Sequence, residues 1–418
     1  MLATLRNAWK IPETRKRILF TLLALLVYRI GSFIPVPYID TSALADIITN
    51  NGMFNLMNII SGGNFSNFTI FAMSISPYIN ASIIMNLLAM IIPSLQELQK
   101  AGEDGRKKIE RYVRYLTMLL ALIQVLGMVF GFQSIMTSDA VIAKVIVGLT
   151  IVAGTAILMW LGEQITEKGI GNGISLIIFT SIVTTIPAGV VKTYDYLVNG
   201  TIKVYLFIVL VILVAAAIMA IVAVNEGQRK IPVQYAKRVV GRKVYGGRST
   251  SIPLKLNQSG VIPIIFASSL TMFPSTLASF FPNTAWLKWL SEKLAWGGVA
   301  ATIIYVILII AFAFFYTSAI FNPYDVANNL KKYGGFIPGI RPGSPTAEYI
   351  RKASNKLTLA GGIFLAIVAV LPIFMGNALG ISLQFSGTTL IIVVGVALDT
   401  IKQLEQQLMM RNYSGFLK

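Results

Sequence analysis

Few side chains in this 418-residue sequence could carry out covalent or acid–base chemistry. The chain contains neither cysteine nor histidine, which excludes thiol chemistry, disulfides and imidazole as a base or metal ligand. Asp399 is the only acidic residue in the predicted membrane spans given below, so no pair of carboxylates is available within them for proton transfer. The sequence therefore predicts neither an enzyme nor a site for a metal or cofactor.

Nucleotide chemistry is not indicated either. The sequence has no Gly-x4-Gly-Lys-[Ser/Thr] motif, so we expect no phosphate-binding loop. The run Gly169-Ile-Gly171-Asn-Gly173 looks superficially like a dinucleotide fingerprint. It opens a predicted membrane span instead of following a strand, so it does not predict nucleotide binding.

The composition indicates a protein that crosses the membrane many times. Apolar residues make up 55% of the chain, charged residues only 12%, and the mean hydropathy is +0.72. A soluble domain has about 25% charged residues. The net charge of +18 could suit nucleic acid, but in a membrane protein the bias of Lys and Arg toward cytoplasmic loops is the first explanation.

The most unusual polar side chains lie in the stretch 52–93. A short apolar segment, 53–63, is far below the roughly 20 residues that a spanning helix needs. An uncharged span interrupted by Pro77 follows it, with polar side chains that lipid cannot satisfy. We interpret the pair as a short re-entrant plug leading into a pathway-lining helix; a surface-lying segment followed by a kinked packing helix is the alternative. The apolar plug residues are Phe54, Leu56, Met57, Ile59 and Ile60.

Ten predicted spans must position these residues. They define an all-α membrane protein, and an odd number of spans per half gives two five-helix halves in opposite orientation. We expect an amphipathic segment 1–17, a first half 18–192, a second half 193–404 and a tail 405–418. The spans are 18–36, 69–93, 112–132, 141–161, 173–191, 204–224, 258–281, 299–321, 357–378 and 383–401.

The positive charges support this topology. Most of the 35 Lys and Arg residues fall in the termini and in the loops predicted to share their side, so both termini are predicted to be cytoplasmic. Arg29 lies inside the first span and needs a partner. Lys144 also lies within a span, and the exceptions on the other side are Lys192, Lys203, Lys288 and Lys293.

The second spans of the two halves resemble each other. Pro77-Tyr-Ile-Asn-Ala-Ser82 and Pro263-Ile-Ile-Phe-Ala-Ser268 share the form Pro-x-Ile-x-Ala-Ser. Proline-broken spans at matching positions of inverted halves indicate a pathway at the interface of the repeats. Chance similarity between two apolar helices is the alternative.

Two predicted cytoplasmic loops carry more charge than topology requires. Residues 225–255 predict a cationic hairpin, since Lys and Arg alternate there with β-forming residues around Gly241. Residues 322–355 contain the turn-rich run Gly334 to Gly343, which presents Arg341. The loops are either solvated topogenic segments or docking sites for an anionic partner such as RNA or an acidic protein.

Several motifs together resemble the SecY/Sec61 family of protein-conducting channels. They are Ser76-Pro77-Tyr78-Ile79, the glycine run with Ile174-Ser175, Tyr235-Ala-Lys-Arg238 before Gly241-Arg-Lys-Val-Tyr245, and Gly339-Ile-Arg-Pro-Gly343. The resemblance covers essentially the whole chain. It implies a passive pore in a bacterial plasma membrane that passes unfolded preproteins and releases apolar segments into lipid. It also implies partners: SecE and SecG subunits, and the SecA ATPase or a ribosome as the source of energy.

The resemblance also suggests roles for individual residues. It implies a pore ring of Ile75, Ile79, Ile174, Ile178, Ile265 and Ile392, a lateral gate that includes Asn80, Asn86 and Phe273, and contacts to SecA or the ribosome through Arg242, Lys243 and Arg341. The first four ring residues form two pairs spaced by four, so each pair projects from one helix face.

An ion-coupled secondary transporter with inverted repeats remains the alternative function. Such a transporter normally carries an ionisable residue near mid-membrane, and the predicted spans offer only Asp399 near an end, which weakens this alternative.

Overall fold

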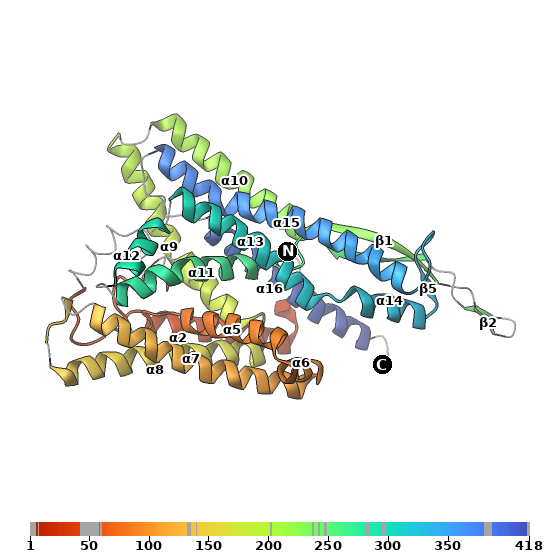
Figure 1. Cartoon of the computed structure of the whole chain (residues 1–418), viewed down its shortest axis with the longest axis horizontal. Coiled ribbons are helices and arrows are strands. Elements are labelled where there is room, and N and C mark those ends of the chain that lie inside the picture. The colour runs from red at the N-terminus through yellow and green to blue at the C-terminus, as the bar shows by residue number, and fades with distance from the viewer. Residues whose placement is uncertain are drawn as a thin grey trace.

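The structure of the chain is a computed structural model. It describes residues 6, 8–41, 58, 61–131, 135–138, 140–200, 203–235, 238–240, 243–245, 249–280, 284–294, 298–379 and 387–415. This part forms a bundle of long helices, with a smaller lobe that contains a β-sheet projecting from one end (Figure 1). The predicted plug residues Phe54, Leu56, Met57, Ile59 and Ile60, and the docking residue Arg242, lie outside the described residues.

The first half of the bundle contains the helices up to residue 198. The segment between α2 and α5 is built mainly of turns from Gly62 to Ile75. The helices are α2 (Pro12–Gly31), α5 (Ser76–Ile91), α6 (Pro93–Lys100), α7 (Glu103–Gly131), α8 (Val141–Lys168) and α9 (Gly173–Val198).

The second half combines five long helices with the lobe. The helices of the bundle are α10 (Val204–Glu226), α11 (Ile262–Phe280), the short α12 (Ala285–Lys293), α13 (Val299–Ile320), α15 (Ser344–Leu379) and α16 (Gly387–Gly415). The elements of the lobe are β1 (Gln228–Tyr235), β2 (Arg238–Val240), β3 (Lys243–Tyr245), β4 (Ser249–Lys255), α14 (Pro323–Lys332) and β5 (Gly335–Phe336).

Length and hydropathy support a membrane bundle. Within the described residues, seven helices are long and apolar enough to cross a membrane, and α5 with α6 adds a pair bent by 107°. Of the remaining two predicted spans, α2 begins with a cluster of charged residues and α11 is apolar over Ile262–Thr271. Together these helices occupy the positions of the ten predicted spans.

The two halves repeat the same order of packing. In each half the second long helix packs on the third, the third on the fourth, the fourth on the fifth, and the first on the fifth. In the first half these contacts join α5, α7, α8, α9 and α2, and in the second α11, α13, α15, α16 and α10. The repeat predicted from the paired Pro-x-Ile-x-Ala-Ser motifs is consistent with this arrangement.

The halves meet along two seams. At one, α11 contacts α5 and α7; at the other, α16 contacts α9. Figure 1 shows α11 beside α5 near the middle of the bundle. Side chains that lie between the two halves are therefore bordered by both seams.

Several predicted helix boundaries were wrong. The span predicted over 69–93 is helical only from Ser76, because Pro77 stands in the first turn, where its missing N–H costs no hydrogen bond. Pro263 likewise follows the first residue of α11. Both prolines therefore begin helices instead of breaking them. The helices α7, α8 and α15 extend beyond their predicted spans, since hydropathy marks only the lipid-facing portion.

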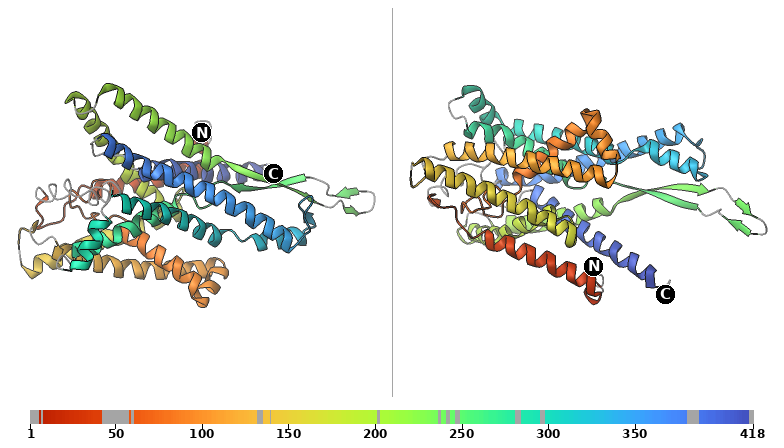
Figure 2. Two further views of the ribbon diagram at one scale, coloured as in Figure 1. Left: turned by 45° about the horizontal axis from the view of Figure 1, so that its top comes forward. Right: turned by 90° about the horizontal axis from the view of Figure 1, so that it is seen from below.

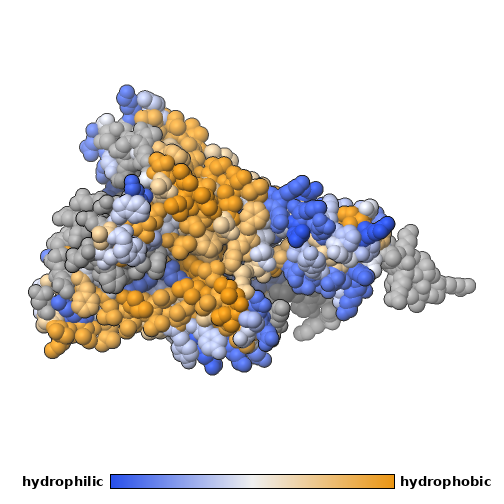
Figure 3. All heavy atoms as spheres, in the orientation of Figure 1, coloured by the Kyte–Doolittle hydropathy of each residue, from blue (hydrophilic) through white to orange (hydrophobic). Residues whose placement is uncertain are grey.

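A broad apolar belt is formed by exposed apolar side chains on helices of both halves. On the face seen in Figure 3 it is a wide hydrophobic surface over the helices, while the coloured part of the lobe is mainly hydrophilic. On α2 one face exposes Leu22, Leu23 and Leu26, each more than half exposed. Lipid would cover this surface, which is far too large for a soluble monomer.

Both termini lie at the end of the bundle that bears the lobe, as Figure 2 shows. This arrangement agrees with the even number of predicted spans. The turn between α9 and α10 and the short helix α12 lie at the opposite end (Figure 1). We call these the lobe end and the distal end.

Candidate functional site

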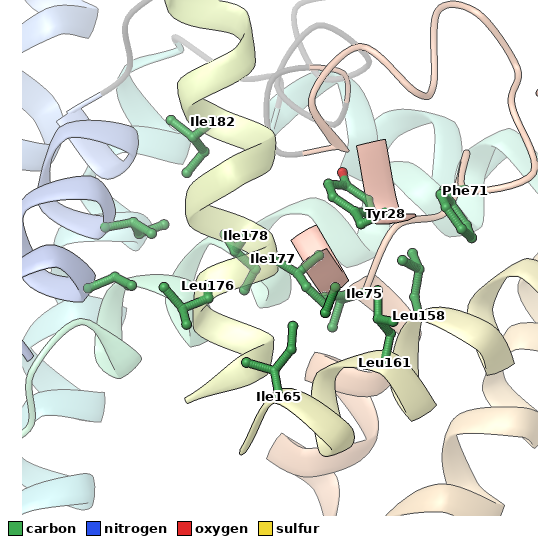
Figure 4. Close-up of a cluster of buried hydrophobic side chains, with 13 residues drawn as sticks. Tyr28, Phe71, Ile75, Leu158, Leu161, Ile165, Leu176, Ile177, Ile178 and Ile182 are labelled. Atoms are coloured by element: carbon green, nitrogen blue, oxygen red, sulfur yellow. The ribbon is translucent and has the colours of Figure 1, made fainter. Parts of the chain in front are cut away.

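A cluster of buried apolar side chains lies where the two halves meet, and we call it the junction cluster. It draws residues from α2, the turns before α5, α8, α9 and α16 (Figure 4). Further apolar residues of α5 and α11 pack against it. It thus contains side chains from both halves and from helices on both seams.

All six residues of the predicted pore ring belong to or contact this cluster. Ile75, Ile178 and Ile392 are buried members. The other three, Ile79, Ile174 and Ile265, are partly buried and pack against it. Four ring residues come from the first half and two from the second. The structure therefore brings together six residues that lie up to 317 positions apart, from Ile75 to Ile392.

Local backbone geometry positions the first ring pair. Ser74 has a positive φ of 51°, uncommon for a residue with a side chain, and it lies one residue before the end of the run of turns. The helix then begins, with the Ile79 amide donating to the Ile75 carbonyl at 3.0 Å. Because α5 starts here, Ile75 and Ile79 lie one turn apart where the helix meets the cluster.

A tight glycine turn positions the second ring pair. A Cβ on Gly173 would collide with the Gly162 carbonyl oxygen, so only glycine allows α9 to start this close to α8. Thr166 Oγ1 accepts a hydrogen bond from the Gly173 amide at 2.9 Å, and Asn172 caps α9 through the Ser175 amide at 3.1 Å. The glycine run thus has a packing role, and it places Ile174 in the first turn of α9.

A cavity of about 430 Å³ opens beside the cluster at the lobe end. Its lining is rich in amide side chains, among them Asn172, Asn257 and Gln403. Val261 and Val396 line the cavity and also belong to or pack on the junction cluster. The cavity is therefore a vestibule with a mixed polar and apolar lining, and part of its apolar lining adjoins the junction cluster.

The predicted gate residues lie on helices that are neighbours. Asn80 and Asn86 are half-buried on α5, and Phe273 is a residue of α11, which contacts α5. The side chain of Phe273 lies outside the part of the chain that the structure describes. The seam itself is confirmed, and the gating role of these residues stays a prediction.

A buried polar knot that the sequence did not reveal lies at the distal side of the cluster. Tyr28 of α2 is 1% exposed, and its hydroxyl oxygen lies 2.6 Å from Ser181 Oγ of α9. Asn64 Nδ2 donates to the same hydroxyl at 3.1 Å, and the hydroxyl donates to the Ser61 carbonyl at 3.4 Å. The sequence shows polar residues within apolar spans, which is a signal for such a group. It does not show that Tyr28 pairs with Ser181, 153 positions away.

The lobe has the predicted hairpin. β1 and β4 pair antiparallel from Gln228 opposite Lys255 to Gln234 opposite Ser249. Alternate β1 residues, Ile231 and Val233, are buried in a separate lobe core. The strands β2 and β3 continue the hairpin, and Lys243 lies on β3, although its side chain is outside the described residues.

Arg341 is exposed on a turn, as the sequence predicted, while its docking role stays a prediction. Ile337 is buried in the lobe core and Ile340 packs against it, so these two side chains anchor the turn on the lobe. Gly339 and Gly343 have φ values of 81° and 107°, which glycine adopts without strain. The Arg341 carbonyl accepts a hydrogen bond from Thr346 Oγ1 at 2.8 Å while its side chain is exposed.

The lobe is joined to α11 by a short polar connection. Asn257 Nδ2 donates to Asn225 Oδ1 of α10 at 2.9 Å and to the Gly260 carbonyl at 3.0 Å. The Ser354 hydroxyl of α15 donates to Gln258 Oε1 at 3.2 Å. The link between β4 and α11 is therefore tied to two other helices.

Two charged side chains of the bundle, Glu163 and Arg29, have partners within it. Helix α8 continues past the predicted span 141–161 and carries Glu163 just beyond it. The Glu163 carboxylate accepts from Arg114 Nε of α7 at 2.6 Å. Arg29 finds its predicted partner in the Phe33 ring, 4.7 Å from the centroid. Among the described residues no cluster of three or more acidic side chains could hold a metal ion.

Comparison with known proteins is decisive about the family. The family profile described as SecY matches residues 69–401. A curated relative from Streptomyces scabiei, the protein translocase subunit SecY, is 46% identical over the full length of both chains. The chain belongs to the SecY family.

Solved structures agree with this assignment at the level of the fold. A structure described as that of a protein conducting channel matches with a TM-score of 0.68 at 19% identity, covering 96% of each chain. Sec61 in the canine ribosome-channel complex from the endoplasmic reticulum matches with a TM-score of 0.64 at 18% identity and the same coverage. These matches show that the chain shares its fold with protein-conducting channels over 96% of its length.

Proposed function

We propose that this chain is the channel-forming subunit of a protein translocase, a passive pore for unfolded preproteins. The observation that carries the proposal is the junction cluster, which contains or contacts six isoleucines from both halves and lies beside the vestibule. A polypeptide entering from the lobe end would encounter amide side chains first and the apolar ring next. The SecY name of its full-length relatives supports the same function.

The ring would act as a seal that still admits a chain. Branched apolar side chains offer no charge to hold an ion, and a narrow apolar constriction excludes water. Their contacts with a passing polypeptide are non-directional, so many sequences can pass. The predicted plug, 53–63, would close the resting pore.

Lateral release would use the seam between α5 and α11. This seam joins α5 of the first half to α11 of the second. If α5 and α11 part, an apolar segment inside the pore reaches lipid and gains the free energy of burying its side chains there. Asn80, Asn86 and Phe273 are the residues we assign to this gate.

The lobe would dock the partner that supplies energy. Arg341 stands exposed on a fixed turn, Lys243 lies on β3 of the hairpin, and Arg242 directly precedes Lys243 in the sequence. These cations suit SecA or ribosomal RNA, and the Sec61 relative of known structure is bound to a ribosome. We also propose SecE and SecG as membrane partners, and a bacterial plasma membrane location with both termini in the cytoplasm.

The ion-coupled transporter is not favoured. Glu163 is engaged with Arg114, and Asp399 is an exposed residue that lines the vestibule. Neither is an isolated mid-membrane carboxylate beside the junction cluster. The match of the chain to SecY translocase subunits over its full length points the same way.

Ion conductance tests the ring. Replacing both Ile79 and Ile178 with glycine removes two apolar side chains from the seal, so the resting channel should hydrate and conduct ions in planar bilayers. Ile208 and Ile303 are exposed on α10 and α13, so Ile208→Gly with Ile303→Gly is the matched control and should stay closed. A ring variant that folds normally and stays as silent as the parent protein would show that the seal lies elsewhere.

A translocation assay tests the function itself. Vesicles containing this chain, SecE, SecG and SecA should import an unfolded preprotein in the presence of ATP. A secondary transporter would instead accumulate a small solute without those partners, and vesicles with that behaviour and no import would overturn the proposal.

A further inference from the structure

The short helix α12 has two unlike faces. Leu287 is buried, so one face lies against the bundle, and α12 packs on α11. Trp286 and Trp289 are 63% and 61% exposed and lie three positions apart, which puts them on the opposite face. Lys293 is exposed one turn further along the same face.

The orientation of α12 also differs from that of its neighbours. It lies across the distal end of the bundle instead of running along it (Figure 1). It sits between the C-terminal end of α11 and the start of α13, which has its own exposed apolar residues, Val299 and Ile303. A helix in this position lies where the apolar belt ends.

Other aromatic residues mark the same level at another place on the bundle. Tyr194 near the end of α9 and Tyr205 at the start of α10 are both 59% exposed. Exposed lysines, Lys192 and Lys203, accompany them. Aromatic rings with a polar tip, flanked by lysines, gather at the boundary between acyl chains and headgroups. A lipid boundary surrounds the whole bundle, whereas a protein partner covers one side, so these two separate positions favour lipid.

We propose that α12 is an interfacial helix that docks on the lipid boundary of the distal leaflet through Trp286 and Trp289. The indole rings lie among the upper acyl chains, and their N–H groups and Lys293 reach the polar headgroups. Because α12 packs on α11, it ties the distal end of that seam helix to the membrane surface. This inference rests on geometry and does not depend on the proposed translocase function.

Docking of α12 on the lipid boundary would restrict how α11 can move at the seam. Displacing the distal end of α11 along the membrane normal would pull two indole rings out of the boundary or drive them into the acyl core, and both are unfavourable. Movement within the membrane plane carries no such cost. The seam helix is therefore expected to swing sideways and not to slide along its own axis.

Tryptophan fluorescence tests the docking. The chain has five tryptophans, so phenylalanine at the other four leaves Trp289 as the single probe. In vesicles of phosphatidylcholine and phosphatidylglycerol, lipids brominated near the carboxyl end of the acyl chain should quench Trp289 more than lipids brominated near the methyl end. Aqueous iodide should quench it weakly.

Two matched probes calibrate this measurement in the tryptophan-free background. Leu23→Trp lies on the exposed apolar face of α2, far from the ends of that helix, and should show the opposite depth preference. Tyr333→Trp lies at a 72% exposed position of the lobe and should respond only to iodide.

Two results would overturn the proposal. Trp289 could respond to iodide as strongly as the Tyr333→Trp probe and ignore every brominated lipid, which would place α12 in water. It could also be shielded from iodide only after SecE or SecG is added, which would make a protein the occupant. Both are read without any transport assay, so they are independent of the channel function.

Discussion

Removing one hydroxyl group from Tyr28 should loosen the segment that enters α5. Tyr28→Phe keeps the ring and its stacking on Phe71, at a centroid distance of 5.7 Å, and removes only the oxygen at the centre of the polar knot. Ser181 retains its hydrogen bond to the Ile177 carbonyl at 2.9 Å, but Asn64 Nδ2 loses the acceptor 3.1 Å away. Asn64 is 1% exposed, so water does not replace that acceptor.

The size of the effect follows from that lost partner. Leaving a buried donor unsatisfied costs about 1–3 kcal/mol. If the knot forms only in the closed arrangement, this cost raises the equilibrium constant for local opening by about 5- to 150-fold. The loss should be local, because the ring of Tyr28 still fills its place in the junction cluster.

Hydrogen exchange can read this change directly. In the native state, the Gly63 amide donates to the Asn58 carbonyl at 2.9 Å, the Phe65 amide to Ser61 Oγ at 3.1 Å and the Thr69 amide to the Asn64 carbonyl at 3.0 Å. These amides should exchange faster in Tyr28→Phe by the factor given above, while amides in α13 and α15 should not change.

A matched control separates the hydroxyl from the substitution. Tyr205→Phe removes a hydroxyl from a 59% exposed tyrosine at the distal end of α10, and we expect no change in the Gly63 to Thr69 amides. If Tyr28→Phe also leaves those amides unchanged, the knot contributes nothing to closure. If exchange rises equally throughout the bundle, the knot supports global stability and not a local hinge.

Three further predictions concern the gate, the lobe and the glycine turn. Asn80→Cys with Phe273→Cys should form a disulfide on oxidation, detected by gel mobility, and this disulfide should block translocation until it is reduced. Translocation through a channel with the disulfide intact would show that α5 and α11 need not part. Arg341→Glu should lower the rate of SecA association and of import while leaving expression unchanged, and normal import would remove this side chain from the docking surface. Gly173→Ala should lower the melting temperature through the clash with the Gly162 carbonyl, whereas Gly200→Ala, at an open turn, should lower it less.

The number of helices and their order could be predicted from the sequence because lipid demands long apolar runs. Their ends could not. Helix α15 begins at Ser344, 13 positions before the predicted span, because its first turns pack in the lobe core through Ile350 and Ala353, away from lipid. Hydropathy identifies the part of a helix that lies in lipid. Where a helix continues into a folded lobe, its first turns are not uniformly apolar, so hydropathy does not mark its start.

The candidate site was also only partly predictable from the sequence. The two isoleucine pairs, Ile75 with Ile79 and Ile174 with Ile178, have a spacing that indicates a shared face, but the family resemblance was needed to select them among many apolar residues. The knot at Tyr28 was missed because Ser181 is 153 positions away, and hydrogen bonds between such distant residues depend on the fold itself. The paired prolines were recognised correctly but interpreted wrongly, since a proline in the first turn starts a helix and needs no kink.

If the six isoleucines form the proposed pore ring, opening toward lipid and opening across the membrane are expected to be coupled, because the six residues come from helices of both seams. Ile75, Ile79, Ile174 and Ile178 belong to the first half, and Ile265 and Ile392 belong to the second. Ile265 lies on α11 and Ile79 on α5, the helices of one seam, whereas Ile178 and Ile392 lie on α9 and α16, the helices of the other. Parting α5 from α11 must therefore draw Ile265 away from Ile79 and widen the ring, even if the seam between α9 and α16 stays closed. A substitution that favours lateral opening should consequently also raise ion conductance. One that opened the seam toward lipid while the pore stayed sealed would show that the six isoleucines do not form a single constriction.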